Sequence, residues 1–254
     1  AAAAHALVTR DASLRRISFS GYTWQVKESD APVGPGPNRF SGREEDVFVD
    51  ADGYLHLRIA RHGDAWWSSE VICDAPLHHG RYVFTLRGAV DDLDPNAVLG
   101  LFTWDTDAPE HTYREIDIEL SRWGEADAPN AQYVVQPWDT PGNRHRFDLS
   151  LSPTSRTSTH GFGWYPGIVY YQSLAGAAPF PQPAARALHA WEYAGVGVPP
   201  ANGSGNARIN LWLLDGQAPL DGRPVEVVVE SFRFIPGTSR DPEPAAFFLP
   251  LVMP

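Results

Sequence analysis

Short apolar runs, each ended by glycine, proline, asparagine or aspartate, are the feature that most restricts how this chain can fold. The 23 prolines and 22 glycines recur too often for a long helical periodicity to develop. In one run, Leu55, Leu57 and Ile59 alternate with polar residues and therefore share one face of a strand. The same pattern predicts strands at 54–59, 81–86, 97–103, 133–136, 168–172, 208–214 and 225–234, with at most a short helical turn at 184–189.

Strands with one apolar face must bury that face against another layer. The pattern is therefore typical of an all-β protein in which two antiparallel sheets pack face to face. A chain of 254 residues suits one large β domain, and no internal repeat or change in composition marks a boundary. We expect a single domain over 1–254, with terminal arms at 1–16 and 237–254.

The charge of the chain limits its partners. A net charge of −11 argues against nucleic acid and anionic membranes, which are bound by clustered lysine and arginine, and a neutral glycan is a more suitable ligand. No run of 18 apolar residues exists, so we expect no membrane span. The small residues at 1–6 are similar to a signal cleavage region, which indicates a secreted or periplasmic protein, and we expect a monomer.

Three acids at alternate positions form the most informative motif. Glu115, Asp117 and Glu119 are separated by Ile116 and Ile118, so on a strand the acids share one face and the isoleucines share the other. We call these three acids the acid row. Their mutual repulsion destabilises an ordinary strand, so the arrangement indicates a function, and cleavage of a glycosidic bond is one. The alternative is the solvated face of an outer strand.

The spacing of the acid row fits a two-carboxylate mechanism. A retaining glycosidase needs a nucleophile and a proton donor with carboxyl groups about 5 to 5.5 Å apart. The Cα atoms of Glu115 and Glu119 lie about 13 Å apart on a strand, so each side chain must lean inward by about 4 Å, which glutamate can reach. Asp117, shorter and between them, suits a role in orienting Glu115 and raising the pKa of Glu119. No residue is inserted in the motif, so we expect a regular strand without a bulge. The spacing alone does not decide which glutamate attacks.

Several other side chains are candidates for sugar binding. Indole rings stack on the apolar faces of sugars, although a given tryptophan is often part of the core. Polar side chains could contact hydroxyl groups or polarise the site, although a paired charge or a structurally hydrogen-bonded histidine is the alternative for each. The candidates are Trp104, Trp123, Trp138, Glu70, Arg114 and His160.

The acid row resembles glycoside hydrolase family 16, whose laminarinase- and lichenase-like members carry Glu-hydrophobic-Asp-hydrophobic-Glu on a strand of a β-jelly roll. Softer similarities occur in the family's order at 33–40, 100–105, 159–168, 210–213 and 230–234. One departure follows Tyr170 and Tyr171, where the family often has a Trp/Tyr-x-Asp-Gly turn and this chain reads Gln172-Ser173-Leu174-Ala175-Gly176. Substrate specificity therefore cannot be copied from the family.

The resemblance implies a β-jelly-roll sandwich of two antiparallel sheets with a concave substrate cleft. It implies that Glu115 is the nucleophile, Asp117 the assisting acid and Glu119 the general acid/base of a retaining endo-glycoside hydrolase. The implied substrate is a β-linked polysaccharide, by default a β-1,3 or mixed-linkage glucan and alternatively a galactan. We expect no cofactor; a structural calcium occurs on the convex face of related proteins, and no acidic loop here identifies a site for it.

Other functions on the same fold stay open at this point. A non-catalytic glycan-binding protein would have no use for the repulsion within the acid row, which argues against that alternative. A transglycosylase shares the covalent intermediate and transfers the sugar to an acceptor other than water, so sequence does not separate it from a hydrolase. A polysaccharide lyase needs a charge-neutralising cluster near a uronic acid, which the acidic balance disfavours.

Overall fold

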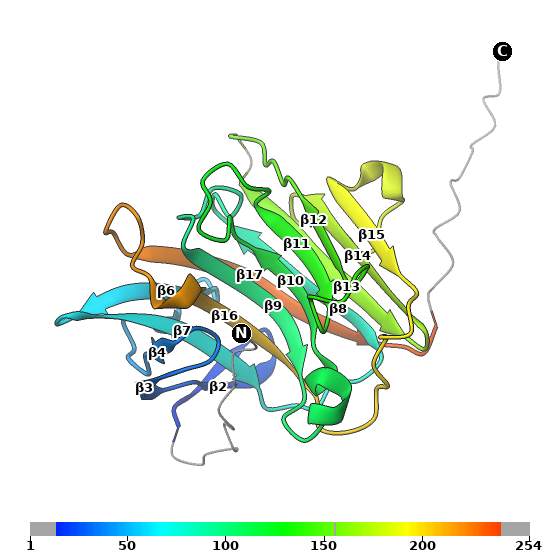
Figure 1. Ribbon diagram of the computed structural model, residues 1–254, viewed down its shortest axis with the longest axis horizontal. Coiled ribbons are helices and arrows are strands. Elements are labelled where there is room, and N and C mark those ends of the chain that lie inside the picture. The colour runs from blue at the N-terminus through cyan, green and yellow to red at the C-terminus, as the bar shows by residue number, and fades with distance from the viewer. Residues whose placement is uncertain (1–13, 155, 240–254) are drawn as a thin grey trace.

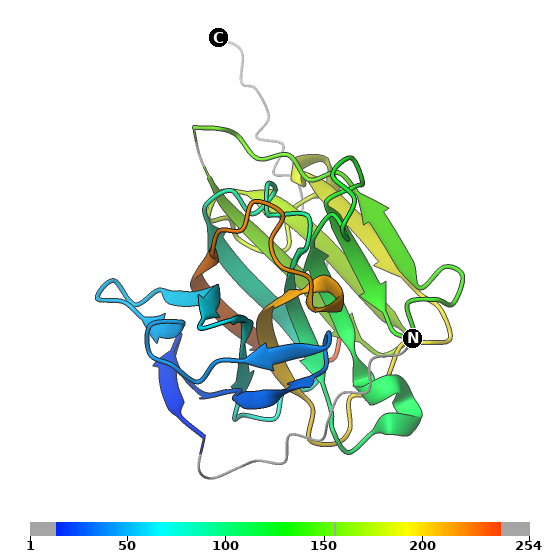
Figure 2. The ribbon, with the colours of Figure 1, turned by 60° about the vertical axis from the view of Figure 1, so that its left-hand side comes forward.

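The computed structural model describes residues 14–154 and 156–239, which form two antiparallel sheets packed face to face (Figure 1). The same two layers are seen from a second direction in Figure 2. This arrangement is the predicted β-jelly-roll sandwich. Residues 1–13 and 240–254 of the expected terminal arms lie outside the described residues.

We call the sheet that carries the acid row sheet I. Its strands, in spatial order, are β1 (Arg16–Phe19), β2 (Tyr22–Val26), β7 (Ala65–Cys73), β16 (Asn206–Leu213), β9 (Ala97–Trp104), β10 (Ile116–Leu120), β11 (Ala131–Val135) and β12 (Arg144–Phe147). Strand β10 therefore lies inside the sheet, with a neighbour on each side.

Sheet II covers the inner face of sheet I. Its strands, in spatial order, are β5 (Val47–Val49), β6 (Leu55–His62), β17 (Val225–Pro236), β8 (Gly80–Arg87), β13 (Thr157–Tyr165), β14 (Ile168–Ala175) and β15 (His189–Tyr193). A hairpin of β3 (Ser29–Val33) and β4 (Asn38–Phe40) lies beside β7, which β4 joins in a short parallel pairing.

The core lies between the sheets and follows the predicted alternation. Leu55, Leu57 and Ile59 of β6 are completely buried, and they belong to the same cluster as Leu99 and Leu101 of β9. Burial of an aliphatic side chain of this size stabilises a fold by about 1.5 to 3 kcal/mol. The period of two along each strand therefore fixes which face of sheet I is left for polar side chains.

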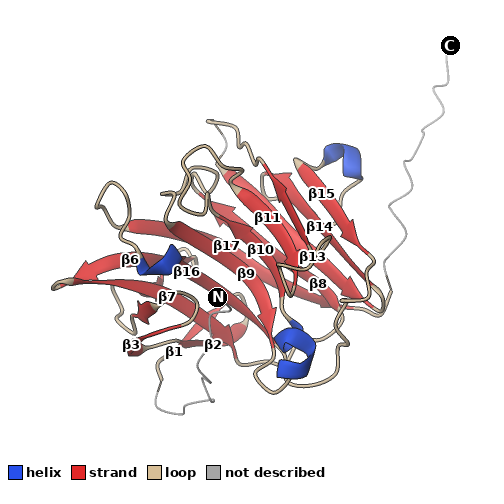
Figure 3. Cartoon of the chain, viewed as in Figure 1, coloured by secondary structure: helices blue, strands red, loops and turns tan. Residues whose placement is uncertain are grey.

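The predicted strands are all present, and several are longer than the apolar runs indicated. The predicted helical turn is the 3-10 helix η2 (Ala184–Arg186), whereas η1 (Pro109–Arg114) and η3 (Leu214–Gly216) were not predicted. Figure 3 shows that strands fill the body of the molecule and that helices occur only in its connections. Among the described residues, no helix has the length and hydropathy needed to cross a membrane.

Candidate active site

Strand β10 has the regular register predicted for the acid row. Residues 116–120 pair with consecutive residues of β11, and 117–120 pair with consecutive residues of β9, so the strand has no bulge. Its isoleucines are completely buried in the core. Asp117 and Glu119 therefore point to the outer face of sheet I, and Glu115 precedes them in an extended conformation with φ −82° and ψ 126°.

Hydrogen bonds connect the acids to each other and to β11. The Asp117 carboxyl is hydrogen-bonded to Glu115 and also accepts a bond from Gln136 Nε2 at 3.0 Å. Gln132 Nε2 donates to Glu119 Oε2 at 2.6 Å. Asp117 is 3% exposed, so its two partners hold it in place beneath the outer glutamates. These bonds orient the acid row before any ligand arrives.

The carboxyl groups of the acid row hold protons more tightly than ordinary acids. Burial, and then the charge of Glu119, raises the pKa of Glu115 to about 8. Burial also raises the pKa of Glu119 to about 7, and burial with the two neighbouring charges raises the pKa of Asp117 well above its usual range. A protonated Asp117 can donate to an ionised Glu115. At neutral pH the row can therefore offer both a carboxylate and a proton donor.

Cations oppose these shifts at the two ends of the row. Arg208 of β16 lowers the pKa of Glu115 against the larger effect of burial. At the other end, Arg146 and Arg144 of β12 act in the same way on Glu119. Sheet I therefore places positive charge on both sides of the acid row.

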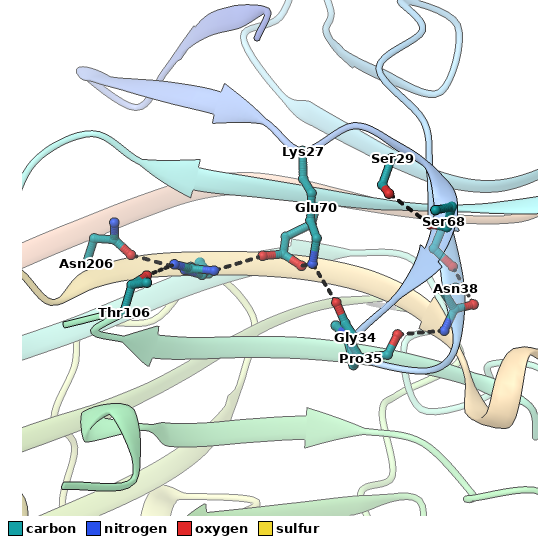
Figure 4. A network of polar contacts seen from close by, with 11 residues as sticks. Lys27, Ser29, Gly34, Pro35, Asn38, Ser68, Glu70, Thr106 and Asn206 are labelled. Carbon is teal, nitrogen blue, oxygen red and sulfur yellow. Dashed lines mark hydrogen bonds and ion pairs between the residues drawn. The ribbon is translucent and has the colours of Figure 1, made fainter. Parts of the chain in front are cut away.

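Glu70 pairs with Lys27 and Arg208 in a buried network, in which Figure 4 labels Glu70 and Lys27. Glu70 is completely buried and accepts bonds from Lys27 Nζ at 2.8 Å and from Arg208 at 3.3 Å. Arg208 also donates to Asn206 Oδ1 and Thr106 Oγ1, at 3.2 and 3.4 Å. The idea that Glu70 contacts a sugar is wrong for this structure, because both of its oxygens are engaged below the surface. The alternative, a paired charge, is confirmed.

Arg114 likewise forms buried structural bonds. It is 8% exposed, and its guanidinium donates to Asp105 and to Asn202 Oδ1, the latter at 3.0 Å. Its carbonyl oxygen accepts a bond from Thr103. Arg114 therefore ties the loop after β9 to a distant loop, while its Nε has no hydrogen-bond partner among the described residues, so contact with sugar hydroxyls stays a prediction.

His160 lies in the core between the sheets and does not polarise the site. It is completely buried on β13, with Nδ1 2.8 Å from Ser173 Oγ and Nε2 2.9 Å from Ser158 Oγ. Burial lowers the pKa of His160 to about 4, so the ring is neutral at physiological pH. The structural alternative is confirmed, since strand alternation turns this position inward.

The three candidate tryptophans have different surroundings. Trp104 is 4% exposed and stacks on Tyr113 at 4.2 Å, which leaves it no free face for a sugar. Trp123 is half-buried, and its Nε1 has no hydrogen-bond partner among the described residues. Trp138 is 48% exposed, and its backbone N–H donates to Gln136, the residue that also bonds Asp117. Trp138 and Trp123 therefore stay candidates for sugar stacking, and Trp104 does not.

Polar residues on the neighbouring strands were missed from the sequence. Gln132 lies on β11 and Gln136 directly follows that strand, and Arg208 and Asn210 alternate with apolar residues along β16. Asn210 lies opposite Gly100, where any Cβ would collide with it, and its buried Oδ1 has no partner among residues 14–154 and 156–239. This alternation is the signal that could have identified them, since a polar residue at every second position of a central strand marks a functional face.

The described part of the chain contains no group of three or more His, Cys, Asp and Glu side chains suited to a metal ion. The expected absence of a cofactor and the structural calcium of the resembled family both stay untested by this observation.

The raised pKa values of the acid row predict that the free energy of unfolding falls as pH rises. Folded Glu115 keeps its proton up to about pH 8, whereas the unfolded side chain loses it near 4.5, so the free energy of unfolding falls across that window. Glu115→Gln removes this dependence. The variant should match the wild type near pH 4 and exceed it at pH 8.5 by an amount on the order of a few kcal/mol. Urea unfolding at both pH values measures this; a difference that does not grow with pH contradicts it.

The sandwich with its acid row defines the class of fold, which is the β-jelly roll found in β-glucanases. A β-glucanase of Bacillus licheniformis superposes with a TM-score of 0.59 at 17% identity, over 85% of this chain and 92% of that one. A β-1,3-1,4-glucanase (lichenase) from a mouse hindgut metagenome gives 0.58 at 16%, over 84% and 92%. An immunostimulatory antigen and pseudo β-1,3-glucanase of Mycobacterium tuberculosis gives 0.59 at 18%, over 84% and 91%.

At these identities the likeness is one of fold. No family model matches the sequence, and no curated protein matches it. The particular activity of this chain must therefore be argued from its own residues.

Proposed function

We propose that this protein is a retaining, endo-acting glycoside hydrolase that cleaves a β-linked polysaccharide. The observation that carries the proposal is the acid row itself, with its two glutamates on the outer face of sheet I and Asp117 hydrogen-bonded between β11 and Glu115. A fold does not dictate an activity, so the chemistry of this site is what supports it.

The acid row can supply both halves of a double displacement. In the first half, Glu119 gives its proton to the glycosidic oxygen while the Glu115 carboxylate attacks the anomeric carbon, so the glycosidic bond breaks and a glycosyl ester forms. In the second half, Glu119 takes a proton from water, whose oxygen displaces Glu115 and restores both groups. These roles follow the resemblance to glycoside hydrolase family 16. The bond from Asp117 and the charge of Arg208 favour an ionised Glu115, but burial raises the pKa of Glu115 to about 8, above the value of about 7 for Glu119, so the assignment of the two roles rests on the resemblance.

The proposed backbone of the substrate is a β-1,3 or mixed-linkage glucan, with a galactan as the alternative. Two of the structurally similar proteins are a β-glucanase and a β-1,3-1,4-glucanase, which supports a glucan. The segment after Tyr171 departs from the usual sequence of the family, so a galactan stays an alternative substrate. The protein is proposed to act as a secreted or periplasmic monomer without a cofactor.

The second candidate is a non-catalytic glycan-binding protein, because a protein described as a pseudo β-1,3-glucanase shares the fold. The proton-holding acid row favours the enzyme, since binding alone does not require three repelling carboxyl groups. A transglycosylase would use the same residues and differs only in the acceptor.

A panel of polysaccharides tests the proposal. β-1,3-glucan, mixed-linkage glucan, galactan and xyloglucan are each incubated with wild-type protein and with Glu115→Gln, and new reducing ends and product lengths are measured. New reducing ends that are absent with Glu115→Gln support hydrolysis. Products longer than the starting chain indicate transglycosylation, whereas binding without cleavage of any member indicates a binding protein.

Trp138→Ala should weaken glycan binding about threefold to tenfold, because a stacked ring contributes about 0.5 to 1.5 kcal/mol. The exposed ring adds little to the fold, so the thermal midpoint should stay within about 2 °C. Leu220→Ala is the matched control, because Leu220 is an exposed apolar side chain far from the acid row in sequence. Isothermal titration in the Glu115→Gln background measures the glycan affinity of both variants. Equal affinities would exclude Trp138 from the binding surface.

A further inference from the structure

Two arginines on β12 face the same side of sheet I as the acid row. Arg144 and Arg146 are exposed at alternate positions, whereas Phe147 of the same strand is buried in the core. Arg146 pairs with Gln132 of β11, which pairs in turn with Glu119 of β10. Arg144 pairs with Val134 of β11, which pairs with Asp117, so the two arginines lie two strands away from β10, level with Glu119 and Asp117.

Hydrogen bonds through Gln132 connect one of these arginines to the proposed acid/base. Arg146 Nε donates to Gln132 Oε1 at 3.0 Å, and Gln132 Nε2 donates to Glu119 Oε2 at 2.6 Å. Arg146 Cζ also lies 5.4 Å from the centre of the Trp123 ring, and Arg144 Cζ lies 5.0 Å from that of Trp138. Each cation is thus held beside a tryptophan that stays a candidate for sugar stacking.

Within the described residues neither arginine forms a close ion pair with a carboxylate, although the charges of Glu119 and Glu125 act on Arg146 without one. Like charges two residues apart on one strand face repel each other. Burial and then the charge of Arg144 lower the pKa of Arg146, and the charges of Glu119 and Glu125 oppose this with a smaller effect. An anion placed between the two guanidinium groups would remove the repulsion and satisfy their free N–H donors.

We propose that Arg144 and Arg146 form a subsite for an anionic sugar, which carries a carboxylate or a sulfate and lies on the β12 side of the acid row. This inference rests on the proposed function for the position of the glycan. It makes the substrate a β-linked polysaccharide with acidic groups, in place of the neutral glycan that the net charge of the chain favoured. The alternative is that the arginines protect an edge strand, since β12 pairs only with β11 among the described strands.

Matched oligosaccharides test the subsite. Short β-1,3-glucan and galactan chains are each prepared unmodified, carboxylated at C6 and sulfated, so that only the charged group differs. Binding is measured by isothermal titration in the Glu115→Gln background, where turnover is blocked. At least one charged form should bind about tenfold more tightly than its unmodified parent, because two charge-assisted contacts are added. The carboxylated and sulfated arms identify which anion the subsite takes.

Two double variants separate a local subsite from overall charge. Arg144→Gln with Arg146→Gln should lose the tenfold preference for the charged form over the unmodified chain. Arg223→Gln with Arg233→Gln removes two exposed arginines elsewhere, so it changes the net charge by the same amount, and should keep the preference. Equal or absent binding of charged and unmodified forms in both sets overturns the inference. A preference that survives loss of Arg144 and Arg146 also overturns the inference. If gel filtration then shows that this variant aggregates, the arginines protect the edge strand.

Turnover of the same oligosaccharides by the wild type keeps the two proposals apart. Cleavage of the unmodified chains with no preference for a charged form overturns the subsite and leaves the hydrolase standing. A charge preference that depends on Arg144 and Arg146, with no cleavage of any chain, supports the subsite and removes the hydrolase.

Discussion

Glu115→Gln should lower turnover of the polysaccharide substrate by at least about a thousandfold, because no other carboxylate can form the glycosyl ester in its place. Glu119→Gln should lower it by about a hundredfold to ten-thousandfold, the usual range for removing a general acid/base. Both substitutions keep the size of the side chain and remove a group whose ionisation burial opposes. The fold and the affinity for the glycan should therefore be retained.

Glu110→Gln is the control for these two variants, because Glu110 is an exposed glutamate in η1 and its loss should leave turnover unchanged. Initial rates of reducing-end formation at saturating and at low substrate separate effects on chemistry from effects on binding. Wild-type rates from both Glu115→Gln and Glu119→Gln would show that the acid row does not carry the reaction.

Glu70→Gln should destabilise the protein by about 3 to 5 kcal/mol, the usual cost of breaking a buried ion pair from one side. The substitution leaves Lys27 and Arg208 buried without their counter-charge, and both are less than a tenth exposed. Arg208 would also lose one of the bonds that hold it near Glu115. We therefore expect lower turnover in the fraction that stays folded, together with a large fall in the urea midpoint.

Asp74→Asn gives the matched comparison on the same sheet. Asp74 pairs with Arg16 at 3.1 Å, but both side chains are about a third exposed, so the loss should be about 0 to 1 kcal/mol. If Glu70→Gln and Asp74→Asn lower the free energy of unfolding by the same amount, burial does not make the Glu70 network more stabilising than an exposed ion pair.

The sequence predicts strands β16, β9, β10 and β11 of sheet I and the acid row, because these depend on alternation within a strand, whereas β1, β2 and β7 were not predicted. The apolar positions of β10 lie in the core as expected, and the acids lie on the other face. Strand β12, with the sequence Arg-His-Arg-Phe, carries no apolar alternation that distinguishes it from a loop, so it was missed. Its position beside β11 is set by tertiary pairing.

The wrong predictions concern side chains whose partners are distant in sequence. The partners of Glu70 lie 43 residues before it and 138 residues after it. No local sequence pattern therefore predicts that Glu70 is buried and paired. His160 resembled a site residue in sequence, but the register of β13 and β14 places it against serines in the core. Trp104 loses its free face to Tyr113, which comes from a helix that was not predicted.

The anomeric configuration of the first product tests the central claim most directly. Proton nuclear magnetic resonance is recorded within the first minutes of hydrolysis of the substrate that the panel identifies, before the free sugar equilibrates. Double displacement through Glu115 and Glu119 predicts that the β-anomer of the new reducing end appears first. If the α-anomer appears first, water attacks the sugar directly, and the role of Glu115 as a nucleophile is contradicted.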